Sequence, residues 1–246
     1  MKNLIEVFID TEKLSKNFSD SITEKYTFKD IVKPRQKGKS NISVIPLDTV
    51  STIEKYKSSG KCCAINMASH KRPGGGVRNG ARAQEEGLFR CSNLTNVISA
   101  DFYPLQENEC LYTENAVFFK DKNYDLIPPI NCDIVTIAAL RLSGIVTDKG
   151  LVSFESEHDR KIYEQITRDK IRLMCSIPSK YGVSNLILGA WGCGVFKNDP
   201  EFISKTFKKI LIEEGYSSLY DNVIFGVIND RNSVANNFEI FSKNLN

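Results

Sequence analysis

Short apolar runs alternate along the chain with longer amphipathic segments. Five of these runs are rich in β-branched residues and lack polar alternation, and they lie at 62–65, 116–119, 134–139, 186–190 and 223–228. Runs of this kind are typical of strands that are covered on both faces. The pattern therefore predicts the strands of a mostly parallel sheet.

Two of the amphipathic segments carry clear helix signals. Asp199 and Pro200 form a cap and a first-turn proline, and Gly215 supplies a stop; between them apolar residues recur at helical spacing. A second helix is predicted at about 156–176, with one stripe made by Ile162, Ile166 and Leu173. Strands that alternate with helices predict a three-layer α/β/α domain, with a ligand at the carboxyl ends of the strands.

The first forty residues differ from the rest of the chain. They are polar and rich in lysine, and they contain one or two helical stretches. We interpret 1–40 as an N-terminal extension that packs on a domain formed by 41–246.

Composition and charge exclude several classes of protein. With 41% hydrophobic and 26% charged residues among 246, the chain is typical of a globular protein, and no apolar run approaches the length of about 18 that crosses a bilayer. Glu6 and Asp10 interrupt the apolar start that a signal peptide requires, so a cytoplasmic location is expected. The net charge of +3 is too small to favour nucleic acid binding.

Basic residues and cysteines do not form a recognisable site either. The one dense basic stretch, at 33–39, contains Pro34 and Gly38, which is typical of a solvated loop. The seven cysteines form no Cys-x-x-Cys pair, and only two histidines accompany them. A metal site is therefore not expected, and most thiols are predicted to be reduced core residues.

A glycine-rich loop follows the predicted strand at 62–65. It runs from Asn66 to the triple glycine Gly74, Gly75 and Gly76. Glycines permit φ > 0 and remove side chains, so such a loop can wrap its N–H groups round a phosphate, although a flexible turn has the same composition. The sequence matches neither the dinucleotide nor the P-loop pattern.

Two adjacent acids, Glu85 and Glu86, follow Gln84 seven residues after the triple glycine. Acids at the start of a helix are common because they suit its dipole. Adjacent helical residues point about 100° apart, so this pair cannot supply the facing carboxylates of an ordinary glycosidase. If the pair is catalytic, one carboxylate must transfer the proton while its neighbour holds the substrate.

A second glycine loop joins the strand at 186–190 to the helix that begins after Asp199. Its geometry presents amides to an anion, and two such loops indicate one ligand with two phosphates. Trp191 is expected in the core. Phe196 could lie against a sugar or pack under the helix as a staple.

Together these residues resemble the microbial-type poly(ADP-ribose) glycohydrolases, a branch of the macrodomains. The resemblance is carried by the triple glycine and Gln84-Glu85-Glu86, by Asn66, Ala68, Ser69 and Pro73 upstream, and by 189–196 with Asn198-Asp199-Pro200 downstream. It extends from about residue 40 to 240 and implies a macrodomain with a mixed, mostly parallel sheet.

The resemblance also implies a reaction and a set of roles. The enzyme would hydrolyse the ribose–ribose O-glycosidic bond of poly(ADP-ribose) and release ADP-ribose. It would need no metal or other cofactor, and it would bind neither DNA nor a membrane. Glu86 would be the acid and base, Glu85 and Gln84 would hold the terminal ribose with Asn66, and Phe196 would orient it. The diphosphate would lie against Gly74, Gly75, Gly76, Val77, Gly192, Cys193, Gly194 and Val195.

Three positions depart from the family pattern: Val77-Arg78, Lys197 where glycine is more typical, and Leu140-Arg141 where proline and asparagine are common. Two other functions remain open on the same pocket. One is hydrolysis of ADP-ribose from a single side chain of a modified protein, and the other is non-catalytic binding of ADP-ribose by a reader or sensor.

Overall fold

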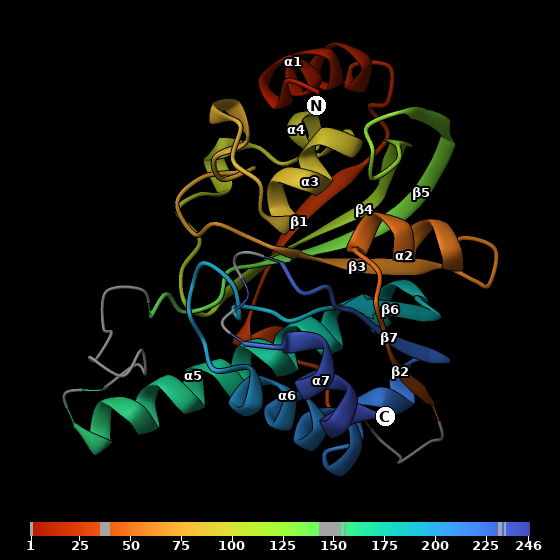
Figure 1. Ribbon diagram of the computed structural model, residues 1–246. Coiled ribbons are helices and arrows are strands. Elements are labelled where there is room, and N and C mark those ends of the chain that lie inside the picture. Colours follow the sequence, from red (N-terminus) through yellow and green to blue (C-terminus); the bar gives the residue numbers. More distant parts are fainter. Residues whose placement is uncertain (1, 35–39, 143–153, 155, 231–232, 234) are drawn as a thin grey trace.

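A mixed sheet organises the computed structural model, which describes residues 2–34, 40–142, 154, 156–230, 233 and 235–246. Within these residues the sheet has seven strands in the order β1-β4-β5-β3-β6-β7-β2. The five strands from β5 to β2 are mutually parallel. At one edge β4 pairs antiparallel with β5, and β1 pairs antiparallel with β4 (Figure 1). The strands are β1 Ile22–Thr27, β2 Asn41–Ile45, β3 Cys62–Met67, β4 Glu109–Lys120, β5 Leu126–Ile137, β6 Asn185–Leu188 and β7 Asn222–Gly226.

Helices cover both faces of the sheet. One face carries α1 Leu4–Ser15, α2 Thr49–Tyr56, α3 Gln84–Cys91 and α4 Leu94–Val97, and the other carries α5 Glu157–Ser176, α6 Pro200–Lys208 and α7 Asn237–Leu245 (Figure 1). Short 3₁₀ turns are η1 Phe28–Asp30, η2 Val77–Asn79, η3 Ala100–Phe102, η4 Ile177–Tyr181 and η6 Tyr216–Leu219, and α6 continues into the π-helical turn η5 Lys209–Glu213.

Each central strand contributes to two hydrophobic cores. In β3, Cys62 and Ala64 pack in the core under α2 and α3, whereas Cys63 and Ile65 pack in the core under α5 and α6. All four side chains are buried. Burial on both faces explains why the strand reads as a continuous apolar run, and it confirms the predicted three-layer α/β/α fold.

The predicted strands and helices are found, but one residue of a predicted buried stripe is exposed and two strands were missed. The five apolar runs lie in β3, β4, β5, β6 and β7, and Asp199 caps α6 while Gly215 ends the helical segment with φ 85°. In α5, however, Ile162 is 44% exposed. The predicted stripe was wrong at Ile162 only, because Ile166 is partly buried and Leu173 is buried; the buried face of α5 also includes Tyr163 and Thr167. Neither β1 nor β2 was predicted, since neither contains a long apolar run.

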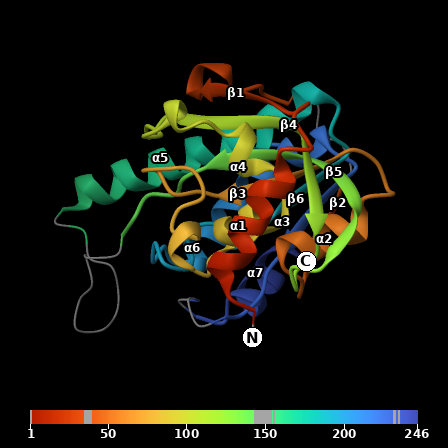
Figure 2. The ribbon, with the colours of Figure 1, turned by 90° about the horizontal axis from the view of Figure 1, so that it is seen from above.

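The leading residues contribute to both the helical layer and the sheet. The helix α1 contacts α3, α4 and η2, and seen from above it crosses over α3 (Figure 2). The strand β1 pairs with β4 and forms an edge of the sheet. A domain boundary near residue 40 stays a prediction.

The cysteines follow the composition analysis. All seven are buried and none forms a disulfide, so the prediction of core thiols is confirmed. The basic stretch at 33–39 lies largely outside the described residues, of which only Lys33 and Pro34 belong to it. None of the helices that the structure describes has the length and apolar character needed to cross a membrane.

Candidate active site

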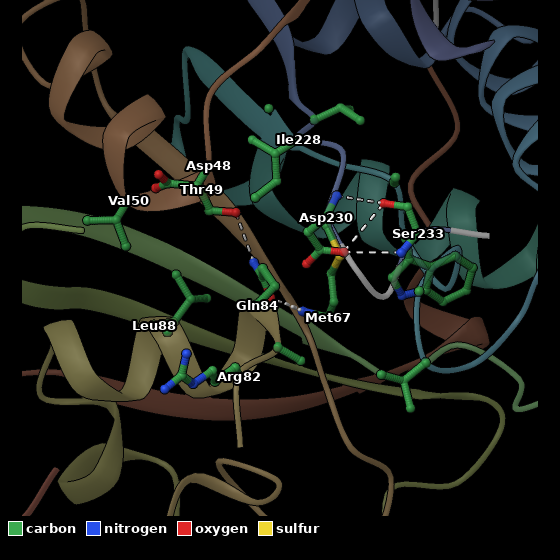
Figure 3. A pocket seen from close by; sticks show the side chains of 18 of the residues that line it. Asp48, Thr49, Val50, Met67, Arg82, Gln84, Leu88, Ile228, Asp230 and Ser233 are labelled. Atoms are coloured by element: carbon green, nitrogen blue, oxygen red, sulfur yellow. Dashed lines mark hydrogen bonds between the residues drawn. The ribbon is translucent and has the colours of Figure 1, made fainter. Parts of the chain in front are cut away.

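Both glycine loops lie at the carboxyl ends of the parallel strands. The parallel strands β3, β5, β6 and β7 end there, so 68–83 and 189–199 emerge side by side. A cavity of about 370 Å³ opens between them. Its walls come from the start of α2, the end of β3, the start of α3, the second loop and the residues after β7 (Figure 3).

The triple glycine forms a tight turn over the two adjacent acids. Gly74 and Gly75 have φ of 71° and 53°. A Cβ atom on Gly75 would lie 2.7 Å from Oε1 of Glu86 and 2.9 Å from Oε2 of Glu85. Position 75 therefore requires glycine both for its left-handed backbone and for the space that the two carboxyl groups occupy.

Glu85 is a buried carboxyl group, 3% exposed. Its Oε2 accepts a hydrogen bond of 2.7 Å from the Ser69 N–H, and its Oε1 accepts from the Gly74 N–H at 3.2 Å and from Asn66 Nδ2 at 3.4 Å. Burial raises the pKa of Glu85 to about 8, and the adjacent Glu86 also raises it, while these hydrogen bonds act in the opposite direction. Burial thus favours the protonated form of Glu85, relative to an exposed glutamate.

Glu86 is held by backbone amides at the start of its own helix. Oε1 accepts a hydrogen bond of 2.9 Å from the Gly76 N–H, and Oε2 accepts one of 2.9 Å from the Ala83 N–H. Amides at the start of a helix lack partners within the helix, and here the Glu86 side chain supplies an acceptor for one of them and for the Gly76 N–H. The two acids thus bind different amides of one turn.

Gln84 joins three elements. Its Oε1 accepts from the Met67 N–H at 2.9 Å, and its Nε2 donates to the Ile65 carbonyl at 2.7 Å and to Thr49 Oγ1 at 3.1 Å (Figure 3). These bonds fix the start of α3 against the end of β3 and the start of α2. Because both polar atoms of the Gln84 amide are hydrogen-bonded within the protein, the side chain borders the cavity in a fixed orientation.

Asn66 is completely buried beside Glu85. Its Nδ2 lies 3.4 Å from both Glu85 Oε1 and Thr136 Oγ1. Its Oδ1 has no hydrogen-bond partner among the described residues. An unpaired buried acceptor costs about 1–3 kcal/mol, so this oxygen would gain from a hydroxyl donor.

The second loop is organised by Asn198, a buried side chain. Asn198 Nδ2 donates to the carbonyls of Leu140 at 2.9 Å, Gly192 at 3.1 Å and Phe196 at 3.4 Å, and Oδ1 accepts from the Tyr163 hydroxyl at 2.8 Å. Four N–H groups of this loop find no acceptor in the described part of the chain, namely those of Gly192, Gly194, Val195 and Phe196. This loop therefore presents amides that remain available to an anion.

Three aromatic and apolar residues around the second loop have distinct positions. Trp191 is buried and its Nε1 donates to the Ile137 carbonyl at 3.1 Å, which confirms its place in the core. Cys193 is buried with its thiol directed at the Trp191 carbonyl. Phe196 packs against the core and also borders the cavity, so both interpretations of it remain open.

The predicted site residues fall into two groups. Those that border the cavity are Gln84, Gly192, Gly194, Val195 and Phe196. The others do not border this cavity: Asn66, Gly74, Gly75, Gly76, Val77, Glu85, Glu86 and Cys193. Of these, Gly75, Gly76 and Val77 line a separate hollow together with Phe8 and Arg78. The N–H groups of the triple glycine bond to Glu85, the Arg72 carbonyl and Glu86. Their predicted role as a phosphate cradle stays a prediction.

Sequence reasoning missed the far wall of the cavity. It comes from Asp48, Thr49 and Val50 at the start of α2, from Arg82 and Leu88 around α3, and from Ile228 after β7 (Figure 3). Lys122 and Tyr124 of the β4–β5 hairpin also contribute. One signal was available, because Asp48 caps α2 with a 2.9 Å bond from the Ser51 N–H directly after β2. The hairpin reaches the cavity only through the tertiary fold.

Two departures from the family pattern acquire a physical meaning. Lys197 has φ 61°, the left-handed conformation that favours glycine. Arg78 points toward α1, where Nη1 donates to Glu12 Oε2 at 3.1 Å and the guanidinium lies 5.2 Å from the Phe8 ring centre. Arg78 thus binds the leading helix, outside the lining of the cavity.

Comparison with known proteins agrees with the resemblance. Residues 9–121, a little under half of the chain, match the family model of the microbial-type PARG catalytic domain. No curated protein sequence matches the chain.

Solved structures match over almost the whole length. Poly(ADP-ribose) glycohydrolase (PARG) from Thermomonospora curvata superposes with a TM-score of 0.82 at 21% identity, covering 98% of both chains. The Deinococcus radiodurans enzyme in complex with ADP-ribose gives a TM-score of 0.73 at 22% identity, covering 96% of both. The chain thus has the fold of the bacterial poly(ADP-ribose) glycohydrolases, and its first half carries the sequence pattern of the microbial-type PARG catalytic domain.

Proposed function

We propose that this protein is a poly(ADP-ribose) glycohydrolase that hydrolyses the ribose–ribose O-glycosidic bond and releases ADP-ribose. The observation that carries the proposal is the pair of buried acids, Glu85 and Glu86, held by the glycine turn beside a cavity at the strand ends. The acid–base step needs one carboxyl group and no metal. We place the reaction in the cytoplasm, because the protein has seven reduced thiols.

The diphosphate of the terminal ADP-ribose unit binds the second loop. The four residues whose N–H groups have no acceptor in the described part of the chain, Gly192, Gly194, Val195 and Phe196, all border the cavity, and no acidic side chain of the loop does. Asn198 keeps these amides in place through its three carbonyl contacts. Backbone amides hold an anion without adding a side-chain charge.

The terminal ribose lies at the Ala68 and Gln84 end of the cavity. Ala68 borders the cavity, and the next residue, Ser69, donates its N–H to Glu85. Asn66 supplies an unpaired acceptor for a ribose hydroxyl. Because Gly75 lies over both carboxyl groups, the turn shifts outward to admit the sugar, a movement for which its left-handed glycines are suited.

Glu86 transfers the proton, an assignment that comes from the resemblance. Its carboxyl group donates a proton to the leaving 2′ oxygen as the bond from C1″ of the terminal ribose breaks, and the sugar becomes oxocarbenium-like. The carboxylate then takes a proton from the water that attacks C1″. Glu85, whose pKa is raised by burial and by the adjacent Glu86, holds a ribose hydroxyl.

The test compares wild type with Glu86→Gln and Glu85→Gln on purified poly(ADP-ribose), with released ADP-ribose measured by chromatography. We expect release by wild type and a loss of about 10²–10⁴-fold in Glu86→Gln, because that is the contribution of a general acid and base. Calorimetry should show that both variants still bind ADP-ribose. Equal rates for wild type and Glu86→Gln would remove Glu86 from this role.

The same experiment separates the two other functions. An enzyme for single ADP-ribosyl groups would release ADP-ribose from a mono-modified protein and none from polymer. A reader would bind ADP-ribose without turnover of either substrate. Either result would replace the proposal of polymer hydrolysis.

A further inference from the structure

Arg90 is a buried cation on α3, and its side chain is 0% exposed. Its Nη2 donates to the Ala81 carbonyl at 2.7 Å and to the Val77 carbonyl at 3.3 Å, and its Nε donates to the Leu4 carbonyl at 3.2 Å. All three bonds go to main-chain oxygens. A buried charge is costly unless it is hydrogen-bonded, so these contacts hold the guanidinium and the three carbonyls together.

The two carbonyls of 77 and 81 belong to the segment that also binds Glu86. The N–H of Gly76 precedes them and the N–H of Ala83 follows them, and both donate to the Glu86 carboxyl group at 2.9 Å. Glu86 and Arg90 are four residues apart on α3 and share one face. Glu86 thus accepts hydrogen bonds from the N–H groups at the two ends of the segment, while Arg90 donates hydrogen bonds to two carbonyls between them.

The leading helix α1 covers Arg90. Thr11 Oγ1 donates to the Arg90 carbonyl at 2.8 Å, and Leu4 accepts from its side chain. Arg78, in the same segment, pairs with Glu12 of α1. The helix therefore excludes water from the guanidinium, which strengthens its hydrogen bonds to the segment.

We propose that Arg90 is a positioning residue for the glycohydrolase reaction: by holding the carbonyls of Val77 and Ala81, it keeps the N–H groups of Gly76 and Ala83 aligned on Glu86. The expected effect on kcat rests on the proposed function. The alignment of the two N–H groups on Glu86 rests on the hydrogen bonds alone. Arg90 itself does not border the cavity.

The kinetic test compares Arg90→Met and Arg90→Lys with Lys120→Met. Lys120 is a matched control, because it is also a buried cation that holds α1, through Asp10 at 2.7 Å and Thr11 at 2.9 Å. It is linked to the Arg90 main chain through the Thr11 hydroxyl, but it donates no hydrogen bond to the carbonyls of Val77 and Ala81. We expect kcat on polymer to fall by up to about 100-fold in Arg90→Met, since small misplacements of a catalytic group have effects of this size.

The two substitutions at Arg90 should lower kcat, whereas Lys120→Met should leave it near the wild-type value. The KM and the affinity for ADP-ribose should change by less than about threefold in all three variants, and Arg90→Lys should recover part of kcat because it retains one cationic donor group. A purely structural role would lower thermal stability in Arg90→Met and Lys120→Met alike and leave both kcat values near wild type. That result would overturn the proposal.

A second measurement does not depend on activity. Amide hydrogen exchange by NMR should show faster exchange at Gly76 and Ala83 in Arg90→Met, with the rates of Lys120→Met at these two sites unchanged. Unchanged exchange in Arg90→Met would also overturn the proposal. If wild type does not cleave polymer, the proposed reaction fails, whereas the exchange experiment still decides whether Arg90 positions Glu86.

Discussion

The backbone N–H of Gly76 donates a hydrogen bond of 2.9 Å to Oε1 of Glu86. Gly74, two residues earlier, donates to Glu85 in the same way. A glycine turn that presents its amides to an anion is occupied here by the protein's own carboxyl groups. The turn and the acids therefore form one unit, and a change in either should alter the other.

Gly75→Ala should abolish polymer cleavage. The added Cβ would meet both carboxyl groups at 2.7 and 2.9 Å, and position 75 has φ 53°. We expect a loss of at least about 100-fold in kcat/KM, because the carboxyl groups would have to move. The measurement is the initial rate of ADP-ribose release.

Gly182→Ala is the control for the backbone penalty alone. Gly182 has φ 69° and nothing within 4 Å of an added Cβ. We expect it to lose about 1 kcal/mol of stability, since alanine is strained in the left-handed region, and to keep full activity. An active Gly75→Ala enzyme would contradict the close contact of the turn with the acids.

The pH dependence of stability should report the protonated Glu85. Its folded pKa of about 8 lies above the ordinary value of 4.5, so the folded state binds the proton more tightly than the unfolded state. The resulting stabilisation is fully present below pH 4.5 and is lost as the pH rises to about 8.

Glu85→Gln should remove this dependence. We expect the free energy of unfolding of wild type, relative to the variant, to fall by on the order of 4 kcal/mol between pH 5 and 8, since each tenfold change in proton affinity is about 1.4 kcal/mol. Urea unfolding across this range measures it. Exposed Glu54→Gln should give a curve parallel to wild type, and a parallel curve for Glu85→Gln would show that Glu85 is ionised in the folded protein.

Asn198→Asp should weaken ADP-ribose binding. The substitution replaces the donor that holds the carbonyls of Leu140 and Gly192 with a carboxylate oxygen that repels them. We expect an affinity loss of more than about tenfold and a stability loss of about 2–4 kcal/mol, the cost of several broken buried hydrogen bonds. Calorimetry with ADP-ribose and thermal unfolding measure the two effects.

Tyr163→Phe is the matched control for Asn198. It removes the 2.8 Å hydrogen bond to Asn198 Oδ1 and leaves the Nδ2 bonds to the loop intact. We expect a stability loss of about 1 kcal/mol with unchanged affinity. An equal loss of affinity in both variants would show that the loop does not depend on the Nδ2 contacts.

Lys197→Gly should stabilise the protein. Lys197 has φ 61° and its side chain is exposed. Glycine removes the left-handed penalty of about 1–2 kcal/mol. Part of this gain is offset because glycine raises the conformational entropy of the unfolded chain, so a net stabilisation of up to about 1 kcal/mol is expected. Lys208→Gly, in an exposed position of α6, should instead lose about 1 kcal/mol. Thermal unfolding compares the two, and destabilisation by Lys197→Gly would contradict the strained conformation.

Local sequence patterns were sufficient for most of the elements. The run at 62–65 predicted a strand because β3 is buried on both faces, and Asp199-Pro200 predicted the start of α6 because capping is a property of neighbouring residues. The strand β1 escaped prediction because it is an edge strand whose residues are all exposed or only partly buried, so it contains no apolar run.

The sequence alone determined the three layers, the order of the two glycine loops and the adjacency of Glu85 to Glu86, since these depend on residues close together in the chain. Only the tertiary structure decided which amides hold those acids, that the β4–β5 hairpin reaches the cavity, and that Arg90 lies under α1. It also decided the raised pKa of Glu85. Burial and the distances between remote segments arise when surfaces far apart in the chain pack together, and no local pattern specifies which surfaces meet.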